Sequence, residues 1–179
     1  GHNIDGTKMG VRGGSFDTYD VWLQHGGNYK GWNIGMSLEF RKTSGDRDRT
    51  IEADTTSSLA QLFSTSAPSA PGALDMRDEN LDAHISLIKD NWTFRLWGLL
   101  VDDYGNADGV TNVLSDGDNN FNSYQWLGSM NYHNDRVLQD LDLDFLLSHM
   151  QNKNDGFLKL FPEGATLALD ADGNFAQPT

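Results

Sequence analysis

The feature that most constrains this chain is a series of segments in which apolar and polar residues alternate. The cleanest segment runs from Trp32 to Phe40, with apolar residues at the even positions and small or polar residues between them. Successive side chains of a β-strand point to opposite faces, so this alternation predicts a strand with one apolar face. Strands are predicted at residues 7–13, 17–27, 32–41, 80–88, 92–101, 121–132 and 137–150.

The connectors between these segments differ in length. Short connectors are predicted at Asn28–Gly31, Lys89–Asn91 and His133–Arg136, and the first, near Gly13–Thr18, is also short. Long loops are predicted at residues 42–79, 102–120 and 151–179. Tight turns at one end of an up-and-down sheet and large loops at the other are typical of outer-membrane barrels. The predicted fold class is therefore all-β, an antiparallel up-and-down meander of about seven strands that is part of a transmembrane β-barrel.

One apolar and one polar face would also suit a soluble β-sandwich, whose apolar face points inward. The placement of aromatic residues favours the barrel. Trp32, Trp92 and Tyr132 lie beside short connectors, and Tyr19, Phe40 and Tyr124 lie toward the long loops. Two such groups on the apolar face predict the aromatic girdles of a membrane barrel. The plain alternative is that Trp and Tyr are simply good strand residues.

Composition excludes several classes of protein. The 179 residues include no cysteine, which removes disulfide scaffolds, thiol catalysis and cysteine zinc sites. A net charge of −13 argues against a nucleic-acid partner and against adsorption to anionic lipid through a basic patch. No stretch approaches the roughly 20 apolar residues of a membrane helix, whereas a spanning strand needs only about 9–11 residues. The start of the chain does not resemble a signal peptide, so a mature protein or a piece of one is expected.

No catalytic or metal-binding constellation is apparent in the sequence. The five histidines are scattered, and we find neither a phosphate loop nor a serine elbow. Asp116–Asn119 and Asp170–Asn174 faintly resemble calcium loops, but the latter lacks the later ligands and closing glutamate of an EF-hand, which favours a turn. We therefore predict no enzyme activity, no cofactor and no metal site.

Charged and aromatic residues on the polar face are the candidates for ligand binding, in the lumen or the loops. They are Arg41, Arg95, Trp97, Asp142 and Asp144. Asp140, Asp142 and Asp144 alternate along the last predicted strand, which suits a solvated face or an acidic stripe in a lumen. Arg12 projects to the same side as Arg41 and Arg95, so ion pairs across this face are expected. Trp22 and Trp97 could pack against a ligand or belong to an ordinary core, and both interpretations remain open.

Several short strings resemble TonB-dependent outer-membrane receptors. Gly13–Tyr19 is similar to the first barrel hairpin of that family. Arg49–Asp54 and Ala70–Gly72 are similar to the second loop in a subset of these receptors. Leu160–Gly164 is similar to an L-F-P-P-G loop segment, with Glu163 in place of the second proline. Receptors of this family enclose a plug domain in a barrel of about 22 strands. This chain has neither a plug nor a TonB box, so the resemblance implies the opening third of such a barrel.

The resemblance also implies a function and partners. The family imports scarce nutrients, often an iron–siderophore chelate, across the bacterial outer membrane. The implied partners are the TonB complex through the plug, the lipid and lipopolysaccharide of the outer membrane, a small-molecule chelate, and the rest of the barrel or a second copy at the open sheet edges. No nucleic acid is expected. The alternative function is a soluble secreted β-sandwich that binds glycan or calcium through acidic loops.

Overall fold

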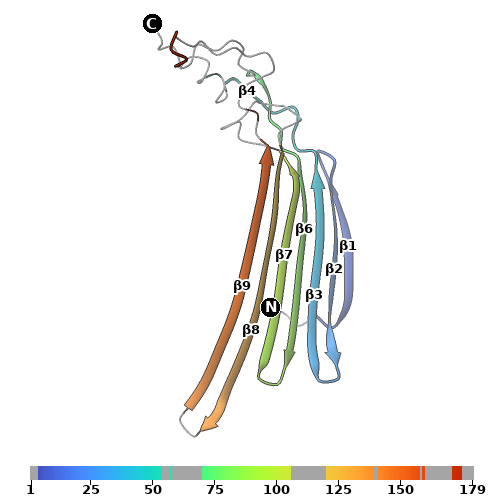
Figure 1. The fold of residues 1–179 in the computed structure, drawn as a ribbon. Coiled ribbons are helices and arrows are strands. Elements are labelled where there is room, and N and C mark those ends of the chain that lie inside the picture. Colours follow the sequence, from blue (N-terminus) through green and yellow to red (C-terminus); the bar gives the residue numbers. More distant parts are fainter. Residues whose placement is uncertain are drawn as a thin grey trace. The chain divides into compact units, whose positions relative to one another are not determined.

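The described residues form a seven-stranded antiparallel sheet and a small two-stranded sheet. The computed structural model describes residues 4–53, 57, 70–105, 120–138, 141–157, 159 and 171–174. Its strands are β1 (Gly6–Gly14), β2 (Thr18–Tyr29), β3 (Trp32–Thr43), β4 (Thr50–Ile51), β5 (Gly72–Ala73), β6 (Asp78–Lys89), β7 (Trp92–Tyr104), β8 (Asn120–Leu138) and β9 (Leu141–Phe157). Seven of them pair in the order β1-β2-β3-β6-β7-β8-β9 (Figure 1). The predicted seven-stranded meander is confirmed.

Contacts divide the chain into two compact units. The first unit contains Gly1–Lys42, Glu79–Asp102 and Ser123–Asn154. The second unit contains Thr43–Asp78, Asp103–Asn122 and Asp155–Thr179. Most of the seven-stranded sheet belongs to the first unit, and the β4–β5 pair belongs to the second.

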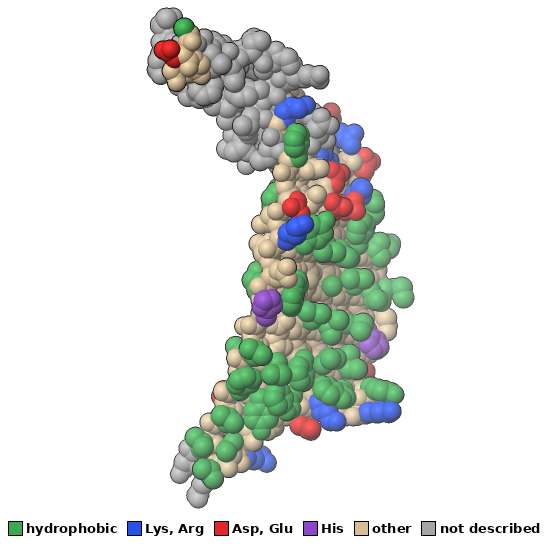
Figure 2. All heavy atoms as spheres, viewed as in Figure 1, with side chains coloured by type: hydrophobic (Ala, Val, Ile, Leu, Met, Phe, Trp, Pro, Cys, Tyr) green, Lys and Arg blue, Asp and Glu red, His purple; other side chains and the backbone are tan. Residues whose placement is uncertain are grey.

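Strand register places apolar residues opposite apolar residues on one face of the sheet. Val21 pairs with Phe40, and Leu81 pairs with Leu100. Figure 2 shows hydrophobic side chains spread over this face of the strands. Among the described residues the one buried hydrophobic side chain is Leu74, which is 8% exposed and belongs to the second unit. The sheet of the first unit is therefore a single layer whose apolar face no described residue covers.

Left-handed backbone conformations close the first two hairpins. Phe16 and Asp17 have φ angles of 62° and 55°, and the Thr18 N–H donates to the Ser15 carbonyl at 3.2 Å. Lys30 and Gly31, at φ 50° and 82°, join β2 to β3. Two consecutive residues with positive φ are the mark of the type I′ turn, whose twist matches that of the flanking strands.

The prediction of a turn at His133–Arg136 is wrong. β8 continues to Leu138 and β9 begins at Leu141, so the predicted start of the last strand at residue 137 is also wrong. Asn134 and Asp135 suggested a turn by composition. In the structure the Asn134 side chain donates to the Tyr132 hydroxyl at 3.0 Å and accepts from the Arg136 N–H at 2.9 Å. Those local hydrogen bonds are compatible with an extended backbone.

Side-chain contacts with β9 accompany β8 along its length. Side chains meet between His133 and Asp144, between Trp126 and Gln151, and between Ser123 and Asn154. The His133 N–H donates to the Asn91 carbonyl in the β6–β7 turn at 2.9 Å, so the hairpin continues beyond that turn (Figure 1). β9 also extends to Phe157, into the range predicted as a loop.

The loop predicted at residues 42–79 contains the β4–β5 pair. Thr50 pairs with Ala73, and the Leu74 N–H donates to the Arg49 carbonyl at 2.9 Å. Nearby, Arg77 binds Asp75 at 2.5 Å and Asp103 at 2.9 Å. The strings Leu160–Gly164 and Asp116–Asn119, and the start of Asp170–Asn174, lie outside the described residues. Over the described part of the chain, no helix has the length and apolar character to cross a membrane.

Candidate functional site

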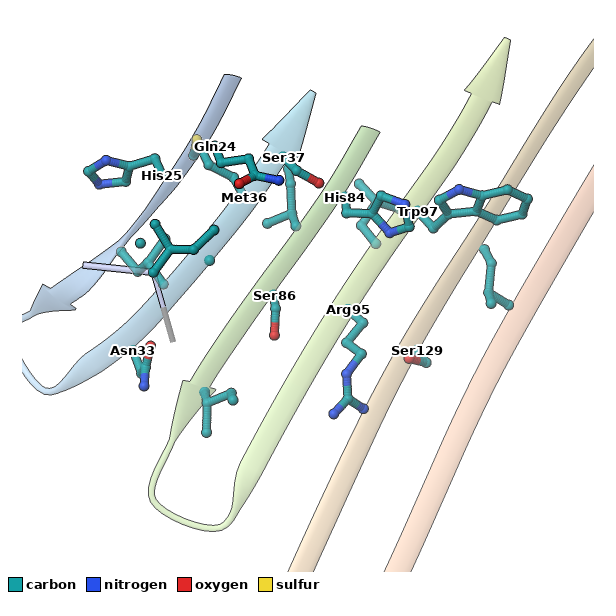
Figure 3. Close-up of a pocket in the computed structure, with 18 residues that line it drawn as sticks. Gln24, His25, Asn33, Met36, Ser37, His84, Ser86, Arg95, Trp97 and Ser129 are labelled. Carbon is teal, nitrogen blue, oxygen red and sulfur yellow. The ribbon is translucent and has the colours of Figure 1, made fainter. Parts of the chain in front are cut away.

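The polar face of the first unit carries a hollow of about 750 Å³. It is lined from β2, β3, β6, β7 and β8 and from Ile4 ahead of β1 (Figure 3). Apart from His25, its polar lining comprises Gln24, Asn33, Ser37, His84, Ser86, Arg95, Trp97 and Ser129. These residues alternate with the apolar set along their strands, so the pleat directs them to the opposite face.

Glycines form the floor of the hollow at one side. Gly26 pairs with Gly6 on β1 and with Gly35 on β3. A Cβ on Gly26 would overlap the backbone carbonyl of Ile4, so the chain can cross the sheet here only because Gly26 has no side chain. The absence of a side chain at Gly26 thereby lets Ile4 lie on the polar face.

Trp97 is fixed in the hollow by a carboxylate on the neighbouring strand. Its indole N–H donates to Asp82 Oδ2 at 2.8 Å, and the other oxygen of Asp82 lies 2.8 Å from His84 Nε2. His84 is also the backbone partner of Trp97, and the two rings lie 6.3 Å apart. The cluster holds the indole in one orientation, with the imidazole beside it (Figure 3).

Arg95 supplies the positive charge of the hollow. Its backbone partner is Ser86, and its side chain lies between Ser86 and Ser129 in Figure 3. No described carboxylate forms an ion pair with Arg95. A guanidinium, an indole and several hydroxyl and amide groups together suit noncovalent binding of a polar or anionic group.

Ion pairs were expected on this face for Arg12, Arg41 and Arg95. Among the described residues, Arg12 forms them. Its guanidinium bridges Asp20 at 2.8 Å and Glu39 at 2.6 Å across β1, β2 and β3. Arg41 is the backbone partner of Asp20, but the carboxylate of Asp20 turns to Arg12. Arg41 does not line the hollow and forms no ion pair with a described residue.

The acidic residues of β9 do not join the hollow. Asp144 Oδ1 lies 2.7 Å from His133 Nδ1, and neither residue is among those that line the hollow. This hydrogen bond raises the pKa of His133, and the charges of Asp144, Asp135 and Asp142 add to the effect. Of the acidic residues predicted either as a solvated face or as a lumenal stripe, Asp144 therefore forms an acid–histidine pair level with the β6–β7 turn. Asp140 lies outside the described residues.

Three aromatic residues predicted as one girdle belong to a connected cluster on the apolar face. Trp92 lies 4.8 Å from Tyr132 and 6.0 Å from Phe94, and Trp32 lies 6.2 Å from Phe94 (centroid distances). Phe94 joins the two tryptophans, which sequence spacing alone did not indicate. At the other end of the strands the rings of Tyr19 and Phe40 lie 6.1 Å apart, and Tyr124 is exposed on β8.

Sequence reasoning missed Asp82 and His84 as site residues. Both lie at polar positions of the predicted strand 80–88, but only the β6–β7 register brings them to Trp97. Within the described ranges, no group of three or more His, Asp or Glu residues is placed to hold a metal ion. Comparisons with protein-family models, curated proteins and solved structures found no match.

Proposed function

We propose that this chain forms part of the wall of an outer-membrane β-barrel of the TonB-dependent receptor type, which imports a scarce nutrient such as an iron–siderophore chelate. One observation carries the proposal: the seven strands form a single layer whose apolar face is uncovered by the described residues. A bilayer would cover that face without a second protein layer.

Strand lengths and end residues support a membrane location. The apolar segments Trp32–Phe40, Trp92–Leu100 and Tyr124–Tyr132 are each long enough to span, because a tilted strand needs about 9–11 residues. Aromatic residues begin or end each of these segments, as they do at the interfaces of membrane barrels. His133 and the rest of the β8–β9 hairpin tip would lie outside the bilayer.

The polar face would then line the lumen. Arg95, Trp97 and the surrounding polar side chains would meet a plug domain or the imported chelate, and the plug would carry the contact to the TonB complex. The free edges of β1 and β9 would pair with the remaining strands of the barrel or with a second copy, because unpaired edges invite association.

The proposal is tested with tryptophan-to-aspartate variants on opposite faces of the sheet. Trp32→Asp and Trp92→Asp should abolish heat-modifiable barrel in outer-membrane fractions, because each places a charge against lipid. Trp22→Asp, on the polar face, is the matched control and should insert normally. Normal insertion of both apolar-face variants would overturn the proposal. A monodisperse protein in plain buffer without detergent would favour the secreted β-sandwich instead.

A further inference from the structure

A second hollow lies on the apolar face, beside the short turns. Its volume is about 330 Å³, and it is lined by Trp32, Lys89, Asp90, Trp92, Phe94 and Met130. Phe94 stacks with Trp92 at an interplanar angle of 13° and tilts against Trp32 at 46°. The walls are thus apolar rings, and the rim toward the β6–β7 turn is charged.

Two lysines lie over aromatic rings at this end of the apolar face, and one of them, Lys89, lines the hollow. Lys89 Nζ lies 5.5 Å from the ring centroid of Trp32, and Lys30 Nζ lies 5.2 Å from that of Tyr29. Tyr29 and Trp32 are backbone partners, so the two cations belong to one end of the same apolar face. Neither ammonium forms an ion pair with a described carboxylate, and Asp90 contributes the carboxylate that lines the hollow.

We propose that this hollow binds an anionic phospholipid, with its phosphate at Lys89 and Lys30 and an acyl chain along Trp32, Phe94 and Trp92. The inference rests on the proposed membrane location. A phospholipid joins a negative group to an apolar chain, which matches cations placed where a ring-lined apolar surface ends. Cation–π contact already holds Lys89 toward the rings, so the ammonium is positioned for the phosphate.

Quenching of tryptophan fluorescence by brominated lipid tests the proposal directly. The full chain is refolded into phosphatidylcholine vesicles that contain an equal minor fraction of either brominated phosphatidylglycerol or brominated phosphatidylcholine. Because Trp32 and Trp92 line the hollow, the brominated anionic lipid should quench at least about twofold more strongly. A Lys30→Gln/Lys89→Gln variant should lose that preference. Lys8→Gln is the matched control, since Lys8 pairs with Gln24 on the polar face, and should retain it.

The outcomes separate this inference from the proposed function. Equal quenching by both brominated lipids in the wild-type chain would overturn the lipid site while leaving the membrane location intact. A double lysine variant that keeps the preference for the anionic lipid would overturn the lipid site in the same way. If neither brominated lipid quenches the tryptophan fluorescence and the protein stays outside the vesicles, the proposed function is overturned together with the lipid site.

Discussion

The backbone carbonyl of Ile4 lies against Gly26, closer than a methyl group on that glycine would allow. Gly26 is flanked across the sheet by Gly6 and Gly35, so the segment entering β1 crosses a surface without side chains. This crossing lies beside the hollow that contains Arg95 and Trp97. The absence of a side chain at Gly26 therefore allows Ile4 to lie on the polar face of the sheet.

Gly26→Ala should release the segment before β1. The added methyl overlaps Ile4, and the expected cost is about 1 kcal/mol because the segment before β1 can shift away from the sheet. Gly27→Ala is the control, since a Cβ there meets nothing within 4 Å. A nitroxide on Asp5→Cys reports the release, and no native cysteine competes for the label. Unchanged label mobility in Gly26→Ala would show that the crossing does not depend on this glycine.

Trp97→Phe should destabilise the sheet by about 1–2 kcal/mol, because it removes a hydrogen bond to the Asp82 carboxylate. Trp22→Phe is the control, because Trp22 lies on the same face and its indole forms no hydrogen bond to a described residue. Its loss of stability should be smaller. Urea unfolding of the two variants in the same detergent gives the comparison. Equal losses would mean that ring packing, and not the hydrogen bond, holds Trp97.

Arg12 should couple more strongly to Asp20 than to Glu39. The Asp20 side chain is 12% exposed and that of Glu39 is 47% exposed, so solvent screens the second ion pair more. Double-mutant cycles with alanine should give a coupling to Glu39 within about 1 kcal/mol and a larger one to Asp20. A larger coupling to Glu39 would contradict the assignment of Asp20 as the main partner.

His133 should titrate above its ordinary pKa, because Asp144 accepts a hydrogen bond from the protonated ring. A raised pKa in the folded state stabilises the fold at pH values below the unfolded pKa, and this contribution is lost as the pH rises through the raised value. NMR titration of the ring should show a lower pKa in Asp144→Asn and a smaller decrease in Asp142→Asn. An unchanged His133 pKa in Asp144→Asn would show that the hydrogen bond with Asp144 does not raise this pKa.

Much of the fold could be predicted from the sequence. Alternation at period two located all seven strands of the sheet, because a pleated strand with one apolar face leaves that pattern wherever it occurs. The β8–β9 turn could not be predicted in this way. Asn134 and Asp135 are turn formers by composition, and only pairing with β9, as in the contact of His133 with Asp144, shows that the strand continues past them.

The sequence by itself determined the strand order, which residues share a face, and the aromatic character of the strand ends. Only the tertiary structure decided which side chains meet across strands. Register brings Asp82 and His84 to Trp97, and it brings Phe94 between Trp32 and Trp92. The physical reason is that side-chain alternation is a property of one strand, whereas register is a property of two strands and of the turn that joins them.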